Sequence, residues 1–129
     1  MALVSKAKVR LLTVLLVVLL VLAVQATARA EPMMASYYRD GFAGVPTASG
    51  EPYDPYSFTA AHPYLPFGTQ LLVTYNGRNT IVTVNDRMSY DSDHDLDLSW
   101  AAAQAIGLTD VGTAVVDAEV VEGPEPSPL

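Results

Sequence analysis

The residue whose type and position most clearly suggest chemistry is Asp86, which follows an alternating apolar run and stands between Asn85 and Arg87. A carboxyl group at the end of a strand can line the mouth of a barrel, and the neighbouring amide and guanidinium can tune its ionisation. Such a group can serve as a general acid or base. Taken by spacing alone, a structural contact of Asp86 with Arg87 or with the backbone is the simpler interpretation.

Three further residues are candidates for the same site, because each lies on a short segment that a small barrel can gather. Glu51 lies in a glycine-rich stretch, His62 precedes a proline, and Asp97 lies just before a predicted helix. Glu51 could add a like charge near Asp86, and His62 could orient a carboxylate or bind a hydroxyl group. The alternatives remain open: an exposed glutamate, a packed strand end, and an aspartate stabilised by a helix N-terminus.

The acidic run from Asp91 to Asp97 invites a calcium interpretation, but the match is poor. No glycine occupies the sixth position from Asp91, and Ala102 stands at the twelfth, where a calcium loop has glutamate. With two histidines and no cysteine, the chain lacks ligands for zinc, and it contains no Gly-x-Ser-x-Gly motif for a serine nucleophile. We therefore expect no metal site and no cofactor.

Aromatic residues are frequent at the predicted strand ends and in the loops, where they could stack on sugar rings or fill the core. They are Tyr37, Tyr38, Phe42, Tyr53, Tyr56, Tyr64 and Tyr90. We expect a mixture of the two roles.

The N-terminal 30 residues differ from the rest of the chain. Three basic residues precede an apolar run at 11–24, and Ala28-Arg29-Ala30 has small residues where signal peptidase reads them. The run is short for a membrane-spanning helix, which needs roughly 20 apolar residues. The sequence thus predicts a signal peptide at 1–30 with cleavage near Ala30, although retention of this segment as an anchor stays open. It predicts a protein that is secreted or lies in the periplasm or cell wall.

The remaining residues make one domain at 31–122 and a flexible proline-rich tail at 123–129. The chain has 129 residues and a formal charge of −7, and residues 31–129 carry three arginines against 14 acidic residues, a charge of −11. Such a surface repels nucleic acid and anionic lipid. We expect a monomer that binds neither nucleic acid nor, once the signal is removed, a membrane.

Short apolar segments separated by turn residues predict an all-β protein. Strands are expected at 33–38, 58–61, 71–75, 79–84 and 114–120. Asn76-Gly77 predicts a tight hairpin, and Ser99 and Gly107 predict the start and end of a helix at 100–106. Residues 39–54 form a long ordered loop in this interpretation, and 90–94 form another loop. Five or six strands with one short helix favour a small closed β-barrel covered at one end.

Six motifs in the same order and spacing resemble the rare lipoprotein A family over residues 34–121. They are Ala35-Ser36-Tyr37-Tyr38, Thr47-Ala48-Ser49-Gly50-Glu51, Phe58-Thr59-Ala60-Ala61-His62, Leu65-Pro66-Phe67-Gly68-Thr69, Val84-Asn85-Asp86-Arg87 and Asp97-Leu98-Ser99. The resemblance implies a six-stranded double-psi β-barrel with one short helix. The chain departs from the family at Met88-Ser89, where Gly-Pro is usual, and at Tyr37-Tyr38-Arg39, where Trp-Tyr-Gly is usual.

The resemblance also implies a function. It implies a lytic transglycosylase that cleaves peptidoglycan glycan strands after N-acetylmuramic acid and leaves 1,6-anhydro ends. Asp86 would be the catalytic aspartate, Glu51 and His62 supporting residues, and Asp97 the acid used by more distant barrel relatives. Tyr37, Tyr38, Tyr53, Asn85 and Arg87 would bind the glycan. The alternatives are an expansin-like module that binds or loosens the wall without cleaving it, and a secreted structural or inhibitory barrel.

Overall fold

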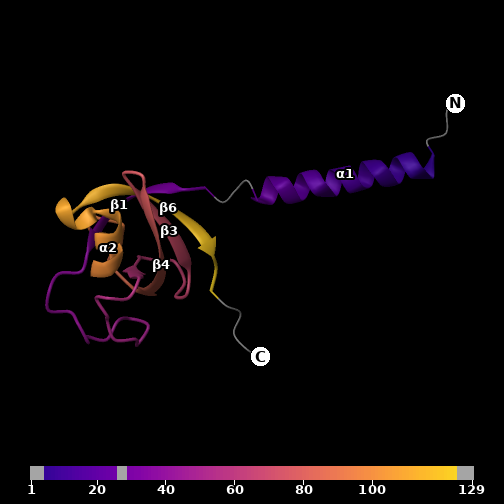
Figure 1. The fold of residues 1–129 in the computed structure, drawn as a ribbon. Coiled ribbons are helices and arrows are strands. Elements are labelled where there is room, and N and C mark those ends of the chain that lie inside the picture. The colour runs from indigo at the N-terminus through magenta and orange to yellow at the C-terminus, as the bar shows by residue number, and fades with distance from the viewer. Residues whose placement is uncertain (1–4, 26–28, 125–129) are drawn as a thin grey trace.

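The protein folds into a closed six-stranded β-barrel with a short helix against it and a separate N-terminal helix (Figure 1). The computed structural model describes residues 5–25 and 29–124. The barrel strands are β1 (Glu31–Tyr37), β2 (Thr59–Ala61), β3 (Gln70–Tyr75), β4 (Arg78–Asp86), β5 (Leu96–Leu98) and β6 (Ala114–Glu122). They close in the order β1-β5-β2-β4-β3-β6. The predicted six-stranded barrel is confirmed.

Two parallel pairs distinguish this barrel from a simple meander. β1 pairs with β5, and β2 with β4, in parallel, whereas the other four pairs are antiparallel. A parallel pair needs a long crossover connection, which the loop after β1 and the segments between β2 and β5 supply. These crossovers bring residues that are far apart in sequence to the same end of the barrel.

The core follows from strand alternation. Alternate side chains in the middle of β3 and β4 are buried, with Leu71, Val73, Val82 and Val84 fully inaccessible. Helix α2 (Trp100–Ile106) adds its buried face, of which Ile106 is the largest member. Burying one such aliphatic side chain stabilises the fold by roughly 1.5–3 kcal/mol.

The local signals for the hairpin and for α2 are confirmed. Asn76 and Gly77 both have positive φ, 49° and 77°, which is the geometry of a turn that matches the twist of its two strands. Ser99 accepts a hydrogen bond from the Ala102 amide at the start of α2, and Gly107 ends the helix with φ 80°. A 3₁₀ turn, η1 (Leu108–Asp110), follows and was not predicted.

Strand β5 was not located from the sequence. It has only three residues, so it shows one alternation, Leu96 and Leu98 buried on either side of the half-exposed Asp97. Its pairing with both β1 and β2 makes it a strand. Long-range pairing decides this element, and no local pattern of three residues can carry that information.

The loop at 39–54 is ordered, as expected. Its two arms meet at an isolated bridge between Pro46 and Pro52, and the Thr47 amide donates to the Glu51 carbonyl at 2.8 Å. The loop is therefore a small hairpin of its own rather than a free connection.

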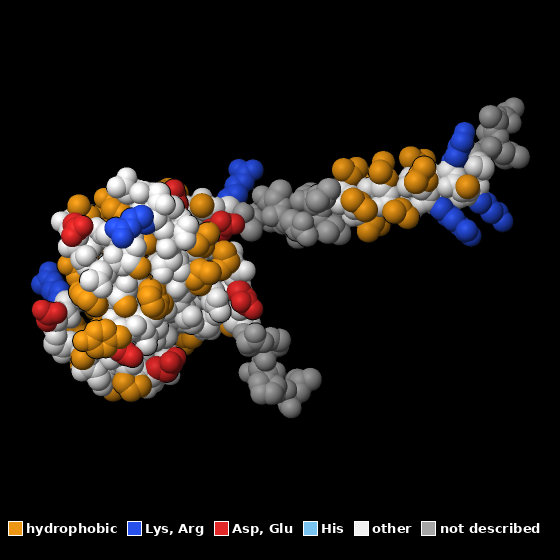
Figure 2. All heavy atoms as spheres, viewed as in Figure 1, with side chains coloured by type: hydrophobic (Ala, Val, Ile, Leu, Met, Phe, Trp, Pro, Cys, Tyr) orange, Lys and Arg blue, Asp and Glu red, His pale blue; other side chains and the backbone are white. Residues whose placement is uncertain are grey.

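Helix α1 (Lys6–Gln25) extends away from the barrel in Figure 1. Figure 2 shows its apolar side chains on the outside and its basic side chains at the end remote from the barrel. Among the described residues, no helix combines the length and apolarity required to cross a bilayer. The predicted cleavage region includes residues 26–28, and most of the predicted tail is 125–129; both segments lie outside the described residues.

Candidate functional site

An open groove with a volume of about 1040 Å³ crosses the end of the barrel. Its lining comes from the ends of β1 and β4, the middle of β5, the loop after β1 and the acidic loop before β5. The lining residues are Ser36, Tyr37, Tyr38, Arg39, Asp40, Phe42, Ala61, Asp86, Arg87, Asp93, His94, Asp97, Trp100, Gly112 and Thr113. Segments that are far apart in the sequence thus meet at one cleft, because the parallel crossovers bring them to the same end of the barrel.

Asp86, which lines this groove, is held by three hydrogen-bond donors. Its Oδ1 accepts from the backbone amides of Ala48 and Arg87, each at 2.8 Å, and its Oδ2 accepts from the Tyr38 hydroxyl at 2.5 Å. Donors to a carboxylate make stronger hydrogen bonds than neutral pairs do. The side chain is therefore fixed in position while remaining partly open to the groove.

Strand pairing explains why Asp97 lies in the same groove. Ala61 of β2 pairs with Asp86 on one side and with Asp97 on the other. Two strand spacings separate these aspartates, which places their α-carbons roughly 10 Å apart. A register shift between Ala60 and Ala61 adjusts the pairing at this point. Irregularities of this kind often redirect side chains next to functional sites.

Asp97 has its own partners, Ser36 and His94, which the sequence motifs did not identify as its partners. The Ser36 hydroxyl and His94 Nε2 both contact Asp97 Oδ1, the latter at 2.7 Å. His94 lies three residues before Asp97, a spacing visible in the sequence, whereas Ser36 reaches Asp97 through the β1–β5 register. Only the contact between His94 and Asp97 could have been predicted from the sequence.

Tyr38 connects Asp86 to the aromatic packing of the loop. Its ring stacks on Tyr53 at 4.3 Å between centroids and meets the edge of Phe42 at 6.0 Å. Burial, the hydrogen bond to Asp86, and the charges of Asp86 and Asp97 raise the pKa of Tyr38 far above its ordinary value. Tyr38 therefore stays a protonated donor at any physiological pH.

His62 lies under the end of β4 and does not line the groove. It is 2% exposed, and its Nδ1 accepts from the amides of Tyr64 and Leu65 at 3.2 and 3.1 Å. Burial first and the nearby Arg87 charge second lower the pKa of His62, while Asp95 raises it. The imidazole is therefore neutral and holds the turn that follows β2.

Arg87 lines the groove and also contacts the turn that follows β2. Its Nη1 donates to the carbonyls of His62 and Asp86 at 3.3 Å, and its guanidinium lies over the Phe67 ring at 4.1 Å from the centroid. Asn85, in contrast, is buried, and its carbonyl accepts from the Ser49 amide.

Glu51 is exposed and is absent from the groove lining. Its carbonyl accepts from the amide and hydroxyl of Thr47, at 2.8 and 2.7 Å. This closes the turn that presents the Ala48 amide to Asp86. The groove thus gathers Asp86, Asp97, Tyr37, Tyr38 and Arg87, whereas Glu51, His62 and Asn85 are not among its lining residues.

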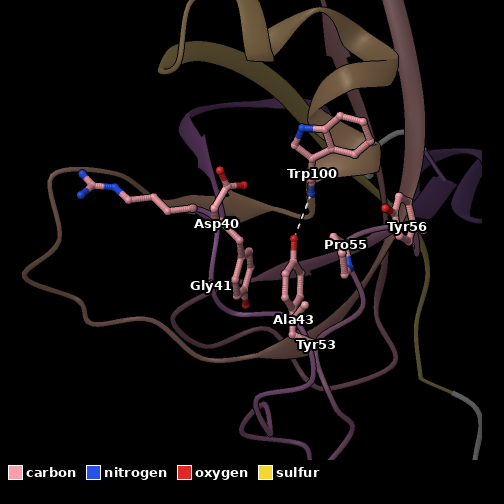
Figure 3. A pocket seen from close by; sticks show the side chains of 9 residues that line it. Asp40, Gly41, Ala43, Tyr53, Pro55, Tyr56 and Trp100 are labelled. Atoms are coloured by element: carbon pink, nitrogen blue, oxygen red, sulfur yellow. Dashed lines mark hydrogen bonds between the residues drawn. The ribbon is translucent and has the colours of Figure 1, made fainter.

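Tyr53 lines a smaller side pocket with a volume of about 310 Å³ (Figure 3). The Tyr53 hydroxyl accepts a hydrogen bond from the Trp100 amide at 3.1 Å. Burial raises the pKa of Tyr53, and this amide donor opposes the shift.

Within the part of the chain that the structure describes, no three His, Asp or Glu side chains are grouped as metal ligands.

The fold and the groove define a small β-barrel protein with an open cleft in which Asp86 and Asp97 are held by hydrogen-bonding partners. A family model described as "Lytic transglycolase" matches residues 30–118, and the chain belongs to this family. The chain is 47% identical over 90 residues to the "Endolytic peptidoglycan transglycosylase RlpA" of Pseudomonas aeruginosa, covering 68% of this chain and 26% of that protein. It is 45% identical over 95 residues to the protein of the same name from Vibrio cholerae, covering 72% and 36%. The predicted family is confirmed.

The chain spans about a quarter to a third of the length of these curated relatives. Two solved structures share its fold. The Streptomyces papain inhibitor matches with a TM-score of 0.59 and 26% identity, over 73% of this chain and 96% of that one. An apo expansin from Clavibacter michiganensis matches with a TM-score of 0.59 and 23% identity, over 75% and 52%. The predicted double-psi barrel is thereby confirmed.

Proposed function

We propose that the protein is a peptidoglycan lytic transglycosylase, which cleaves the glycan strand after N-acetylmuramic acid and leaves a 1,6-anhydro end. The observation that carries this proposal is the pair Asp86 and Asp97 in one open groove, each fixed by hydrogen-bonding partners. The names of relatives that are 45–47% identical support it. Two carboxyl groups flanking a cleft are what glycosidic bond cleavage requires.

In the proposed reaction Asp86 protonates the glycosidic oxygen as the bond to the anomeric carbon breaks. The donors from Tyr38, Ala48 and Arg87 stabilise the carboxylate that remains. Asp97 supplies negative charge near the oxocarbenium-like centre. The sugar's own 6-hydroxyl then bonds to the anomeric carbon and gives its proton to Asp86, which regenerates the acid without consuming water.

Supporting roles are proposed for Glu51 and His62. Glu51 would act through its backbone, by closing the turn that delivers the Ala48 amide to Asp86. His62 would act by holding the turn after β2, from which its amide donates to the Asp86 carbonyl at 3.3 Å. Tyr37 and Arg87, at the groove, would contact the glycan directly.

The test is digestion of purified peptidoglycan by the full chain, with products separated by chromatography and identified by mass spectrometry. Wild-type protein should release 1,6-anhydro products, and Asp86→Asn should release none while keeping the wild-type circular dichroism spectrum. Retention on insoluble peptidoglycan without any product would instead show a binding module. Undiminished release by Asp86→Asn would refute the assignment of the acid.

We further propose that the protein acts outside the cytoplasm as a monomer, after removal of residues 1–30. Peptidoglycan lies outside the cytoplasmic membrane, and the basic and apolar pattern around α1 matches a signal peptide. Mass measurement of the exported form should give an N-terminus at Glu31. An intact N-terminus on a membrane-bound product would show that the segment serves as an anchor.

A further inference from the structure

The side pocket beside the groove has features of a binding site that the proposed cleavage does not use. It has a volume of about 310 Å³, at the lower end of the range for small-molecule sites. Tyr38, Arg39, Asp40 and Trp100 line both this pocket and the groove. A chain-like ligand lying in the groove can therefore continue into the pocket.

Aromatic rings form the walls of the pocket. Figure 3 shows Trp100 and Tyr56 along one side of the pocket, with Pro55 and Tyr53 below Trp100 in this view. The rings of Tyr56 and Trp100 meet at 83° with centroids 6.3 Å apart, and Tyr56 is 77% exposed. Together the two rings offer an apolar surface inside a concave site, and the apolar face of a pyranose ring can pack on such a surface.

A carboxylate faces these rings across the pocket. Figure 3 shows the Asp40 side chain on the side of the pocket opposite Tyr56. Carboxylate oxygens accept hydrogen bonds from hydroxyl groups, so the pocket offers an apolar wall and a polar acceptor together. The strongly negative chain favours a neutral ligand over an anionic one.

The pocket is held rigidly relative to Asp86. The Trp100 amide donates to the Tyr53 hydroxyl, Tyr53 stacks on Tyr38, and the Tyr38 hydroxyl donates to Asp86. This short series of contacts fixes the distance between the pocket and the proposed site of cleavage. A sugar bound in the pocket would thus set which bond of the strand reaches Asp86.

We propose that this pocket is a sugar-binding subsite, in which one pyranose residue of the glycan strand packs against Trp100 and Tyr56 and donates hydroxyl hydrogen bonds to Asp40. The inference rests on the proposed function, because it extends the same groove along the same strand. This subsite would bind a neutral sugar ring in preference to the peptide stem. Substrates long enough to reach the pocket gain affinity from it.

Trp100 is the single tryptophan of the chain, so its fluorescence reports on a ligand in the pocket or in the adjoining part of the groove. Tyr56 lines the pocket and not the groove, so the Tyr56→Ala variant separates the two positions. The full chain carrying Asp86→Asn is titrated with peptide-free glycan strands from purified peptidoglycan, and iodide quenching of Trp100 is recorded at each point. We expect a saturable fluorescence change and protection of Trp100 from iodide. Tyr56→Ala and Asp40→Asn, each on the Asp86→Asn background, should weaken binding about tenfold or more, as loss of one stacking or charged contact does.

Tyr90→Ala is the matched control, because Tyr90 is 74% exposed and lines neither cavity. It should bind glycan like the parent. Calorimetric binding that persists while Trp100 stays fully quenchable, or that Tyr56→Ala and Asp40→Asn leave unchanged, overturns the subsite. So does a response to free stem peptide but not to glycan, or no binding of glycan at all. Release of anhydro products by the wild-type chain is measured separately, so failure of the subsite and failure of the proposed cleavage give different results.

Discussion

The Tyr38 hydroxyl is the link between the aromatic loop packing and the carboxyl group of Asp86. Tyr38→Phe removes this donor and keeps the ring that stacks on Tyr53. Loss of a hydrogen bond to a charged group should lower the rate of anhydro-product release roughly 10- to 100-fold. Thermal unfolding should change little, because the ring packing is retained.

The control for Tyr38→Phe is Tyr75→Phe, which alters a tyrosine at the far end of β3. It should leave the rate of release unchanged. Equal rates for Tyr38→Phe and wild type would show that the contact with Asp86 has no part in cleavage.

The buried His62 should make the stability of the protein depend on pH. Its lowered pKa means that, between that value and about 6.5, the unfolded chain binds a proton that the folded chain does not. The free energy of unfolding should therefore fall as the pH drops from ~7.5 to ~5.5. Urea unfolding at the two pH values measures the difference, and His62→Gln should reduce it.

The other histidine, His94, provides the comparison for this measurement. His94→Gln should keep most of the pH dependence, because the buried imidazole is still present. If His62→Gln keeps the same dependence as wild type, other groups account for it.

Residue types and the family resemblance together identified part of the groove. Asp86 could be found because it ends a long alternating strand, and Asp97 because it precedes a helix cap. Ser36 gave no signal, since its contact with Asp97 depends on the β1–β5 register. Glu51 and His62 belong to the same motifs but do not line the groove, because the direction of a side chain depends on the folded backbone and not on the motif.

At the scale of elements, the hairpin loop at 39–54 positions Asp86 through the Ala48 amide. Gly50 has φ +94° in the turn of this loop, with open space where a Cβ would lie. Gly50→Ala therefore adds backbone strain without a clash, at a cost of about 1–2 kcal/mol. We expect a matching loss of stability in urea unfolding, together with a clear fall in the rate of anhydro-product release.

Gly77→Ala is a matched control for this loop. Gly77 has φ +77° in the β3–β4 hairpin, also with open space around it. The strain is of the same kind, but the turn does not touch the groove. Gly77→Ala should lose similar stability and keep its specific activity. If both variants keep full activity, the Ala48 turn does not position Asp86.

Local patterns predicted the elements with local causes. The Asn76-Gly77 turn and the Ser99 and Gly107 caps depend on single residues, and they were confirmed. β5 depends on pairing with two distant strands, and the short hairpin within 39–54 depends on a bridge between two prolines. Those features arise from pairing between segments that are far apart in the sequence, so they cannot be predicted from a short stretch of neighbouring residues.

At the scale of the whole molecule, charge governs how the protein approaches its surroundings. The chain carries −7 overall and −11 over residues 31–129. A wall that bears phosphate polymers repels such a protein at long range, whereas contacts in the groove act at short range. Added salt shortens the range of the repulsion and should leave the short contacts largely intact.

Retention on phosphate-bearing wall material should therefore rise as salt increases from ~20 to ~200 mM, because the screening length shortens from ~20 to ~7 Å. The comparison is the same wall after chemical removal of its phosphate polymers, on which retention should hardly depend on salt. A pull-down followed by protein quantification gives both curves. Retention that falls with salt on the phosphate-bearing wall would mean that attraction through Arg39 and Arg87 at the groove outweighs the net negative charge. The short-range fit of the groove would then not be the main source of affinity, and binding would follow wall charge rather than glycan structure.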